Sequence, residues 1–399
     1  MIILVCNIGS SSFKFSLLDM DNEQERARGA IERVGLPDSI VSMQVDGAKV
    51  FDGIEQIENQ KQAVAFALKM LEKSEYGVLK NLDELDGIGF KTIQAGDKNG
   101  SVLLDQDVLD AMEAYRDLAP AHNPPYLEAI YMFQELLPTT PLVGVFEPGF
   151  HVNAPEYTKV YGVPYAWYQK YNVKKYGYHG ASHRFVTHEA TRLAGLENKP
   201  HKIITCHLGG SSSVCAFKDG VSIDTSMGFT PQTGLIQGTR VGDMDPFILP
   251  YIMEKEGLSL DEALQACTKN GGMKGLSGIS ADMRDIMAAI DKGDERAQLA
   301  RDKFIYDIKR YVGEFLVILG GLDAIAFSGG IGERDMKLRT EVLGALGFLG
   351  LKINESANAK NAQCVTTTDS KIAGFVINTN EEIVVARETR KVIENLNFC

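Results

Sequence analysis

Two segments of this chain, about half its length apart, share one pattern. Val5–Ser12 reads VCNIGSSS and Thr205–Ser213 reads TCHLGGSSS, and an apolar run follows each of them. Each segment predicts a strand, a Ser/Gly turn and a second strand. A unit that recurs at this distance indicates a duplicated fold with a cleft between its halves. Two unrelated Ser-rich turns would give the same pattern by chance.

The length of the chain also indicates two halves. Its 399 residues exceed what one hydrophobic core usually supports, so we expect two domains. Short apolar runs alternate with helical patterns such as the amphipathic stretch over residues 300–319, which predicts an α/β fold. Thr379-Asn-Glu-Glu382 has the form of a capping box and predicts a final helix that ends near Leu396.

The charge balance limits the partners. Lys and Arg number 41 against 53 Asp and Glu, a net charge of −12, which argues against nucleic acid and against an anionic membrane surface. The sequence has no uncharged apolar run of membrane-spanning length, and the short N-terminal apolar run lacks the basic region of a signal peptide. The six cysteines are scattered without a C-x₂-C pair, which favours a reduced, cytoplasmic protein.

Several Gly-rich segments could bind phosphate. The two Ser/Gly turns offer backbone N–H groups and hydroxyls, although an ordinary polar hairpin has the same composition. Lys14 shares a strand face with Ser12, so it either reaches a phosphate or is a solvated lysine. Ser328-Gly-Gly-Ile-Gly-Glu333 allows close backbone approach to a ligand. The chain has neither a Walker A motif nor a G-x-G-x-x-G fingerprint, so a P-loop fold and a dinucleotide-binding Rossmann site are both disfavoured.

Histidine and arginine mark two further candidate sites. Tyr176–His183 places two histidines in a Gly-rich turn, either beside a cleft or in a structural loop. No C-x₂-C pair accompanies them, so zinc is not expected. Arg240 lies among glycines and acids, where its guanidinium would suit a carboxylate or a phosphate. The alternative is a surface ion pair with Asp243 or Asp245.

Taken in order, these motifs form a specific set that extends from one end of the chain to the other. They are Asn7-x-Gly-Ser-Ser-Ser-x-Lys14, Ala119-Pro-x-His-Asn-Pro124, Tyr176-Gly-Tyr-His-Gly-x-Ser-His183, His207-Leu-Gly, Asp224-Thr-Ser-Met-Gly-Phe-Thr-Pro231, Gly238-Thr-Arg-x-Gly-Asp243, Gly330-Ile-Gly-Glu333 and Thr379-Asn-Glu-Glu382. In this set the chain resembles the acetate kinase family, which comprises acetate, propionate and butyrate kinases. The resemblance implies a duplicated α/β fold of the actin–hexokinase–heat-shock (ASKHA, ribonuclease H-like) type with an interdomain cleft. It places the first domain at residues 1–151 plus 379–399 and the second, with the nucleotide site, at residues 152–378.

The resemblance also implies an activity, in which a carboxylate oxygen attacks the γ-phosphorus of ATP in line and forms an acyl phosphate. The catalytic residues would be Lys91, Glu147, His179 and Arg240. Asn7 and Glu381 would lie around Mg²⁺ (or Mn²⁺). The ATP/ADP site would comprise Ser10, Ser12, Lys14, His207, Leu208, Gly209, Gly210, Ser211, Asp282, Met283, Arg284, Gly330, Ile331, Gly332, Glu333 and Arg334. A short-chain carboxylic acid would contact Lys91, Ile93, Ala121, His122, Tyr178 and Pro231. Family members are typically homodimers.

The departures from the family pattern bear on activity. Lys91 replaces an arginine and loses its bidentate fork, and Glu147 replaces an aspartate with a longer side chain. In the acid pocket Ala121 replaces leucine, Tyr178 replaces phenylalanine and Ile93 replaces valine, so we expect a pocket larger and more polar than one for acetate. Two hypotheses follow. One is an active kinase whose preferred acid differs from acetate, with plain acetate kinase activity as its nearest variant, and the other is a nucleotide-binding pseudo-enzyme with a regulatory or assembly role.

Overall fold

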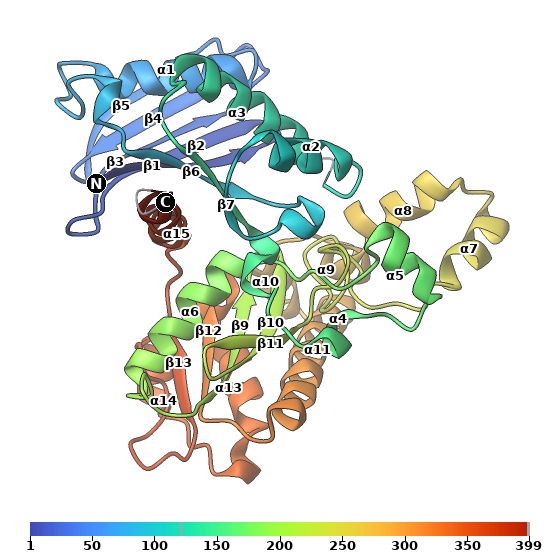
Figure 1. The fold of residues 1–399 in the computed structure, drawn as a ribbon. Helices are drawn as coiled ribbons and strands as arrows, with labels where there is room; N and C mark the ends of the chain where they lie inside the picture. The colour runs from blue at the N-terminus through green and yellow to red at the C-terminus, as the bar shows by residue number, and fades with distance from the viewer. Residues whose placement is uncertain (120–121, 397–399) are drawn as a thin grey trace. The chain divides into compact units, whose positions relative to one another are not determined.

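The structure, a computed structural model, describes residues 1–119 and 122–396, so the predicted pocket residue Ala121 lies outside the described residues. The chain divides into two compact units. Unit 1 comprises Met1–Val152 and Asn380–Cys399, and unit 2 comprises Asn153–Thr379. Each unit has its own sheet and its own apolar core (Figure 1).

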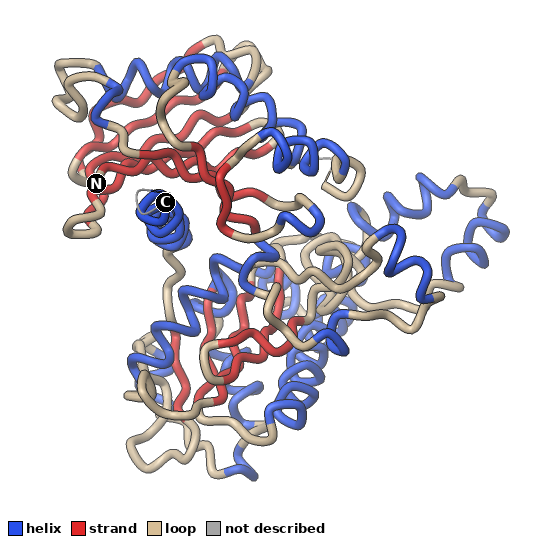
Figure 2. Tube along the Cα trace, in the orientation of Figure 1, coloured by secondary structure: helices blue, strands red, loops and turns tan. Residues whose placement is uncertain are grey.

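Unit 1 contains an eight-stranded sheet in the order β5-β4-β3-β2-β1-β6-β8-β7 (Figure 2). Its strands are β1 (Ile2–Gly9), β2 (Ser12–Asp19), β3 (Gln24–Glu32), β4 (Ser39–Val45), β5 (Ala48–Glu55), β6 (Gly87–Thr92), β7 (Ser101–Leu103) and β8 (Leu142–Phe146). β1 to β5 form an antiparallel meander, whereas β6 pairs parallel with both β1 and β8. The carboxyl ends of β1, β6 and β8 therefore meet at one edge of the sheet.

Helices cover both faces of this sheet. They are α1 (Gln60–Glu72), α2 (Gln106–Ala114), α3 (Asn123–Leu136) and α15 (Glu381–Leu396). Figure 1 shows α1, α2 and α3 over one face and α15 over the other. α15 packs closely on β6 because glycine stands there: a Cβ on Gly87 would lie 2.2 Å from Ile393, and one on Gly89 would lie 2.3 Å from Thr389. The predicted final helix is confirmed, but its cap is Asn380, whose Oδ1 accepts from the Ile383 amide at 3.0 Å, one residue later than the predicted capping box.

Unit 2 contains a five-stranded sheet in the order β11-β10-β9-β12-β13. Its strands are β9 (Lys202–Leu208), β10 (Ser212–Lys218), β11 (Val221–Thr225), β12 (Ala324–Ser328) and β13 (Ala373–Val376). Its helices are α4 (Glu156–Lys159), α5 (Tyr165–Tyr171), α6 (Gly180–Leu193), α7 (Ile248–Glu256), α8 (Leu260–Lys269), α9 (Gly272–Ser277), α10 (Met283–Ile290), α11 (Glu295–Leu319), α12 (Gly329–Arg334), α13 (Met336–Gly344) and α14 (Glu355–Ala359). α6 and α11 pack on the sheet, and α7 and α8 project from the rest of the unit (Figure 1).

The two sheets share a core, as the repeated sequence pattern predicts. The order β3-β2-β1-β6-β8 in unit 1 corresponds to β11-β10-β9-β12-β13 in unit 2. In each core the first three strands are antiparallel and the last three are parallel. The two Ser/Gly turns occupy the same place, between β1 and β2 and between β9 and β10. The predicted duplication is therefore confirmed.

Two observations concern the chain as a whole. Among the described residues, no helix combines the length and apolar character needed to cross a membrane. Cys6, Cys206, Cys215, Cys267 and Cys364 are free thiols.

Candidate active site

In unit 1, three predicted site residues lie at the edge where the parallel strands end. Cys6 of β1 pairs with Phe90 of β6, so Asn7 and Lys91 follow at the same level on neighbouring strands. Phe146, the last residue of β8, pairs with Thr92, and Glu147 comes directly after it. The register of the sheet therefore gathers an amide, an ammonium and a carboxylate at one edge.

Lys91 lies between two carboxylates. Its Nζ is 2.5 Å from Glu381 Oε2 and 3.3 Å from Glu147 Oε1. Glu147 is only 4 % exposed, and Lys91 and Glu381 are about one-fifth exposed at 19 % and 21 %. Burial acts to lower the pKa of Lys91, but the charges of Glu147 and Glu381 outweigh it and raise that pKa well above its ordinary value. Lys91 therefore keeps its positive charge at this edge of the sheet.

The same corner offers oxygen ligands. The Tyr126 hydroxyl, which is fully buried, accepts a hydrogen bond from the Ile8 amide at 3.0 Å and donates one to Asn7 Oδ1 at 3.4 Å. Among the described residues, no group of three or more His, Cys, Asp and Glu side chains is placed to hold a metal ion. One amide oxygen and one carboxylate, Asn7 and Glu381, fit a cation such as Mg²⁺ that takes its other ligands from phosphates and water.

The remaining predicted residues of unit 1 are spread around this edge. Ser10 is exposed in the β1–β2 turn and Ser12 is partly buried where β2 begins. Lys14 is 56 % exposed and lies 4.0 Å from Glu32, as in a solvated surface pair. Ile93 is partly buried just after β6, and His122 is exposed before α3.

Unit 2 contains a cavity of about 800 Å³. It is lined by Gly209, Gly210, Ala281, Asp282, Met283, Arg284, Met287, Gly330, Ile331, Arg334, Asp335, Met336 and Lys337. Eight of these residues are predicted nucleotide residues, drawn from three separate segments of the sequence. Hydrogen bonds from Arg284 lower the pKa of Asp282 to about 2, so this carboxylate stays ionised at the cavity wall. Of the other predicted nucleotide residues, Leu208, Ser211, Gly332 and Glu333 lie next to lining residues in the sequence, and His207 lies two residues before Gly209.

Arg240 lies elsewhere in unit 2, and the structure contradicts the surface ion-pair alternative. Its Nη1 donates to Ser211 Oγ at 3.1 Å, to the Pro231 carbonyl at 3.2 Å and to Gln237 Oε1 at 3.0 Å. All three acceptors are neutral, and burial lowers the pKa of the guanidinium. Asp243 instead pairs with Arg310, at 2.5 Å. Arg240 is thus held in place without a carboxylate that would neutralise it.

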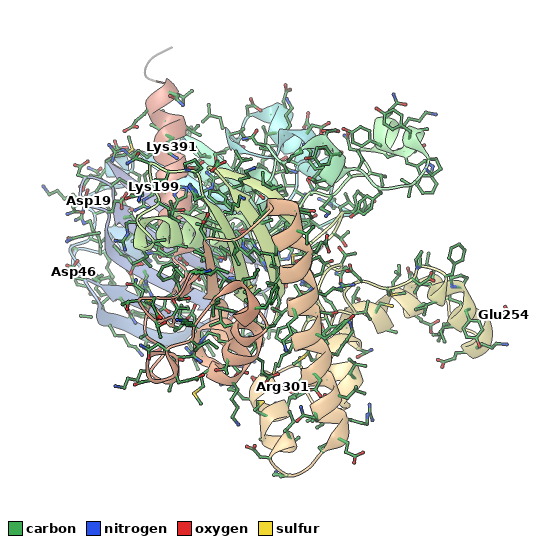
Figure 3. All side chains as sticks on the ribbon, turned by 90° about the horizontal axis from the view of Figure 1, so that it is seen from below. Asp19, Asp46, Lys199, Glu254, Arg301 and Lys391 are labelled. Carbon is green, nitrogen blue, oxygen red and sulfur yellow. The ribbon has the colours of Figure 1, made fainter. Side chains whose placement is uncertain are left out.

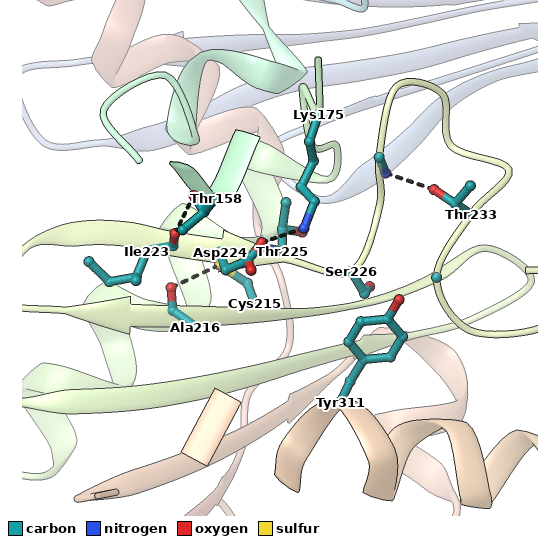
Figure 4. A network of polar contacts seen from close by, with 12 residues as sticks. Thr158, Lys175, Cys215, Ala216, Ile223, Asp224, Thr225, Ser226, Thr233 and Tyr311 are labelled. Carbon is teal, nitrogen blue, oxygen red and sulfur yellow. Dashed lines mark hydrogen bonds and ion pairs between the residues drawn. The ribbon is translucent and has the colours of Figure 1, made fainter. Parts of the chain in front are cut away.

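The segment that carries Pro231 and Arg240 is anchored at both ends. At its start Lys175 pairs with the buried Asp224 at 2.7 Å, within the polar network of Figure 4. At its end Asp243 Oδ1 accepts from the Gly234 amide at 2.8 Å and Oδ2 accepts from the Tyr311 hydroxyl at 2.6 Å. This anchoring fixes the backbone carbonyl that holds Arg240.

The two histidines of the Gly-rich turn share a serine. His179 Nδ1 and His183 Nε2 each lie 2.8 Å from Ser213 Oγ, and His183 Nδ1 lies 2.7 Å from Thr205 Oγ1. His179 has a positive φ of 57°, and its ring centroid is 4.7 Å from that of His207. The signal in the sequence for this pair was the Gly-rich turn that carries both histidines. Thr205 and Ser213 are the first and last residues of the repeated segment Thr205–Ser213, but their contact with the histidines was not predicted.

Tyr178, a predicted residue of the acid pocket, is 4 % exposed, and its hydroxyl donates to the Phe229 carbonyl at 2.9 Å. The proton of this hydroxyl is therefore used within the protein, and the larger, more polar acid pocket stays a prediction. Sequence reasoning missed five residues of the cavity wall, which lie outside any Gly-rich motif: Ala281, Met287, Asp335, Met336 and Lys337.

Comparison with solved structures identifies the fold class of this chain. The structure superposes with a TM-score of 0.91 on the acetate kinase of Porphyromonas gingivalis, which is 36 % identical and is matched over 98 % of this chain and 99 % of that one. It superposes with a TM-score of 0.90 on a propionate kinase of Francisella tularensis, which is 34 % identical with the same coverage. The fold is therefore the duplicated ASKHA type, as predicted.

The family follows from the sequence. The profile of the acetokinase family matches residues 2–387. The acetate kinase of Clostridium novyi is 42 % identical over 99 % of both chains, and that of Carboxydothermus hydrogenoformans is 43 % identical over 98 % of this chain and 99 % of its own. This chain belongs to the acetokinase family.

Proposed function

We propose that this chain is a carboxylate kinase that transfers the γ-phosphoryl group of ATP reversibly to a short-chain carboxylic acid, giving an acyl phosphate and ADP. The observation that carries the proposal is Lys91, held between Glu147 and Glu381 at the end of three parallel strands. A fixed cation beside buried carboxylates suits a reaction in which two anions must meet. The glycine-lined cavity of unit 2 has room for a nucleoside.

The residues fit direct in-line transfer, in which the protein supplies position and positive charge. Lys91 would orient the acid and Arg240 and His179 would stabilise the equatorial oxygens of the transferring group. Asn7 and Glu381 would hold Mg²⁺, which neutralises charge on the phosphates when it is bound with ATP. Glu147 would keep Lys91 oriented and charged.

The two altered residues compensate each other. Relative to the family pattern, Lys91 is the shorter cation and Glu147 the longer acid, and they still meet at 3.3 Å. This matched change favours a retuned active site over a decayed one. The acid would therefore be one other than acetate, such as a larger or hydroxylated short-chain acid.

A hydroxamate assay tests the function. Hydroxylamine traps acyl phosphate, so the protein is incubated with ATP, Mg²⁺ and each of a panel of C1 to C6 carboxylic acids. We expect product with at least one acid, and a maximum above C2 if the pocket is enlarged. If no acid gives product while ATP still binds, the pseudo-enzyme is the correct alternative.

A double-mutant cycle separates retuning from loss. We expect Lys91→Arg and Glu147→Asp each to reduce turnover of the preferred acid, and the double variant to recover part of it because it restores a matched pair. In a pseudo-enzyme, the double variant would instead raise acetate turnover from near zero. Additive losses in the cycle would contradict the compensation between the two side chains.

We also propose that the protein acts in the cytoplasm as a homodimer. Large apolar side chains are exposed in two stretches of unit 2, residues 157–171 and 247–264, and Tyr157, Trp167, Phe247 and Tyr251 are between 49 % and 79 % exposed. Such side chains in a protein of this charge are typical of an interface. Light scattering tests this, and a monomer at micromolar concentration would contradict it.

A further inference from the structure

Arg339 of α13 is the largest side chain that is fully buried, with 0 % exposure. Its guanidinium makes four hydrogen bonds. Nη1 donates to the Gly332 carbonyl at 2.8 Å, and Nη2 donates to the Asn358 carbonyl at 2.9 Å and to Asn361 Oδ1 at 2.6 Å. Nε donates to Asn358 Oδ1 at 2.8 Å. The side chain thus joins α12 to α14 and the turn that follows it.

These acceptors are all neutral oxygens. Buried charged side chains are usually paired. Arg301 of α11, labelled in Figure 3, pairs with Glu341 at 2.8 Å. Burial lowers the pKa of Arg339 and the charge of Asp335 raises it, but a guanidinium remains protonated in either case. Asp335 Oδ1 is occupied in capping α13, where it accepts from the Leu338 amide at 2.9 Å. The interior of unit 2 therefore contains a cation that its hydrogen-bond partners do not neutralise.

This cation lies directly behind the wall of the nucleotide cavity. Gly332, whose carbonyl it holds, stands between the lining residues Ile331 and Arg334 of α12. On its own helix, the lining residues Met336 and Lys337 come three and two positions before it. One side chain thus joins two of the helices that line the cavity, α12 and α13.

We propose that Arg339 is a positioning residue for the nucleotide: it holds α12 against α13 and adds buried positive charge that favours the phosphates of ATP. This inference rests on the proposed nucleotide site. Because a charge behind the wall is poorly screened by water, its effect grows with the charge of the ligand. A purely structural tie would affect ATP, ADP and adenosine alike.

Asn361→Asp tests the charge without removing the arginine. Asn361 is exposed, has a positive φ of 50° that Asp tolerates, and would place a carboxylate on Nη2. Affinities for ATP, ADP and adenosine are measured by calorimetry without Mg²⁺ at low salt. We expect Kd for ATP to rise about three- to tenfold, less for ADP and little for adenosine. The increase for ATP should shrink as salt is added.

Asn354→Asp is the matched control. It adds the same charge at the start of α14, where Asn354 caps the helix through the Ala357 amide and Asp caps equally well. We expect it to leave the ratio of ATP to adenosine affinity unchanged. An equal loss of ATP and adenosine affinity in Asn361→Asp, or an equal effect of both variants on ATP, would overturn the charge role.

Variants of the arginine itself provide the second measurement. Arg339→Lys should retain more of the preference for ATP over adenosine than Arg339→Met, whereas Arg301→Met should lower stability without changing that preference. If Arg339→Met folds and keeps the wild-type preference, the proposal is wrong. If the wild-type protein binds none of the three ligands, the proposed nucleotide site fails, which is a different result.

Discussion

The two units share one five-stranded core, but different groups lie at the ends of its strands in each unit. At the strand ends of unit 1, side chains fill the edge, and Lys91, Glu147 and Glu381 form a compact ionic cluster. In unit 2 the corresponding ends carry glycines, and the space in front of them is a cavity of about 800 Å³. One topology therefore carries a cluster of charged side chains in one unit and a glycine-lined cavity in the other.

The first and largest test compares the cations of the two units. We expect Lys91→Met and Arg240→Met each to lower kcat/KM by about 10²-fold or more, since each removes positive charge from the reaction. Only Lys91→Met should also destabilise its unit, by about 3–5 kcal/mol, because it leaves Glu147 buried without its cation. Arg240→Met should cost much less, because its bonded partners are neutral.

Urea unfolding of both variants measures this difference. The double variant Lys91→Met/Glu147→Gln is the control, since removing the buried charge should recover part of the stability. Equal stability losses for the two single variants would show that the ionic cluster is no special feature of unit 1.

The second test fills the cavity of unit 2. A Cβ on Gly330 would meet no atom within 4 Å, so Gly330→Val should fold normally and project into the cavity. We expect Kd for ATP to rise at least about tenfold, measured by calorimetry, since the valine occupies ligand space. Gly313→Ala, in α11 with equally open surroundings, is the control. Unchanged ATP binding by Gly330→Val would show that the nucleotide does not bind in this cavity.

The third test compares glycines that follow equivalent strands. Gly329 follows β12 with a φ of +74°, and its Cβ would lie 2.5 Å from the Leu208 carbonyl oxygen. Gly96 comes after β6 with a φ of +60°, and its Cβ would meet the Tyr115 ring at 2.4 Å. We expect Gly329→Ala to cost about 1–3 kcal/mol and Gly96→Ala less, because a ring can move and backbone cannot. Thermal unfolding of both variants decides the order.

The smallest expected effect concerns pH. Because the folded-state pKa of Lys91 is raised, its stabilisation is fully present below the ordinary lysine pKa of ~10.4 and is lost as pH rises toward the folded-state value. The difference in melting temperature between wild type and Lys91→Met should therefore be constant from pH 7 to about 10 and shrink above it. A difference that shrinks below pH 9 would mean that Glu147 and Glu381 do not hold the ammonium charged.

Local sequence patterns predicted the duplicated core because strand, turn and strand are encoded within a few residues. The same holds for the glycines of the cavity, since a strand end followed by glycine brings backbone to a ligand wherever the sheet lies. The predicted N-cap of the last helix was one residue too early in the sequence. Thr379 and Asn380 are both good N-cap residues, and the backbone conformation determines which of them caps the helix.

Contacts between distant elements could not be predicted in this way. The link from His183 to Ser213 joins α6 to β10, and that from Arg339 to Asn361 joins α13 to a turn. Ser213 belongs to the repeated Ser/Gly segment and Asn361 to no motif, and in neither case does the local sequence name the partner. Such partners are brought together by tertiary packing, which a short sequence pattern does not predict.

The return of α15 to unit 1 has a consequence for synthesis. Glu381 and the helix that packs on β6 leave the ribosome only after all of unit 2 has been made. Until then the face of the sheet bearing Gly87 and Gly89 lacks its cover, and Lys91 lacks one of its two carboxylates. Nascent chains that end between Lys337 and Thr379 would therefore carry every segment that lines the cavity of unit 2, but not Glu381, so the ionic cluster of unit 1 forms only after α15 has been made.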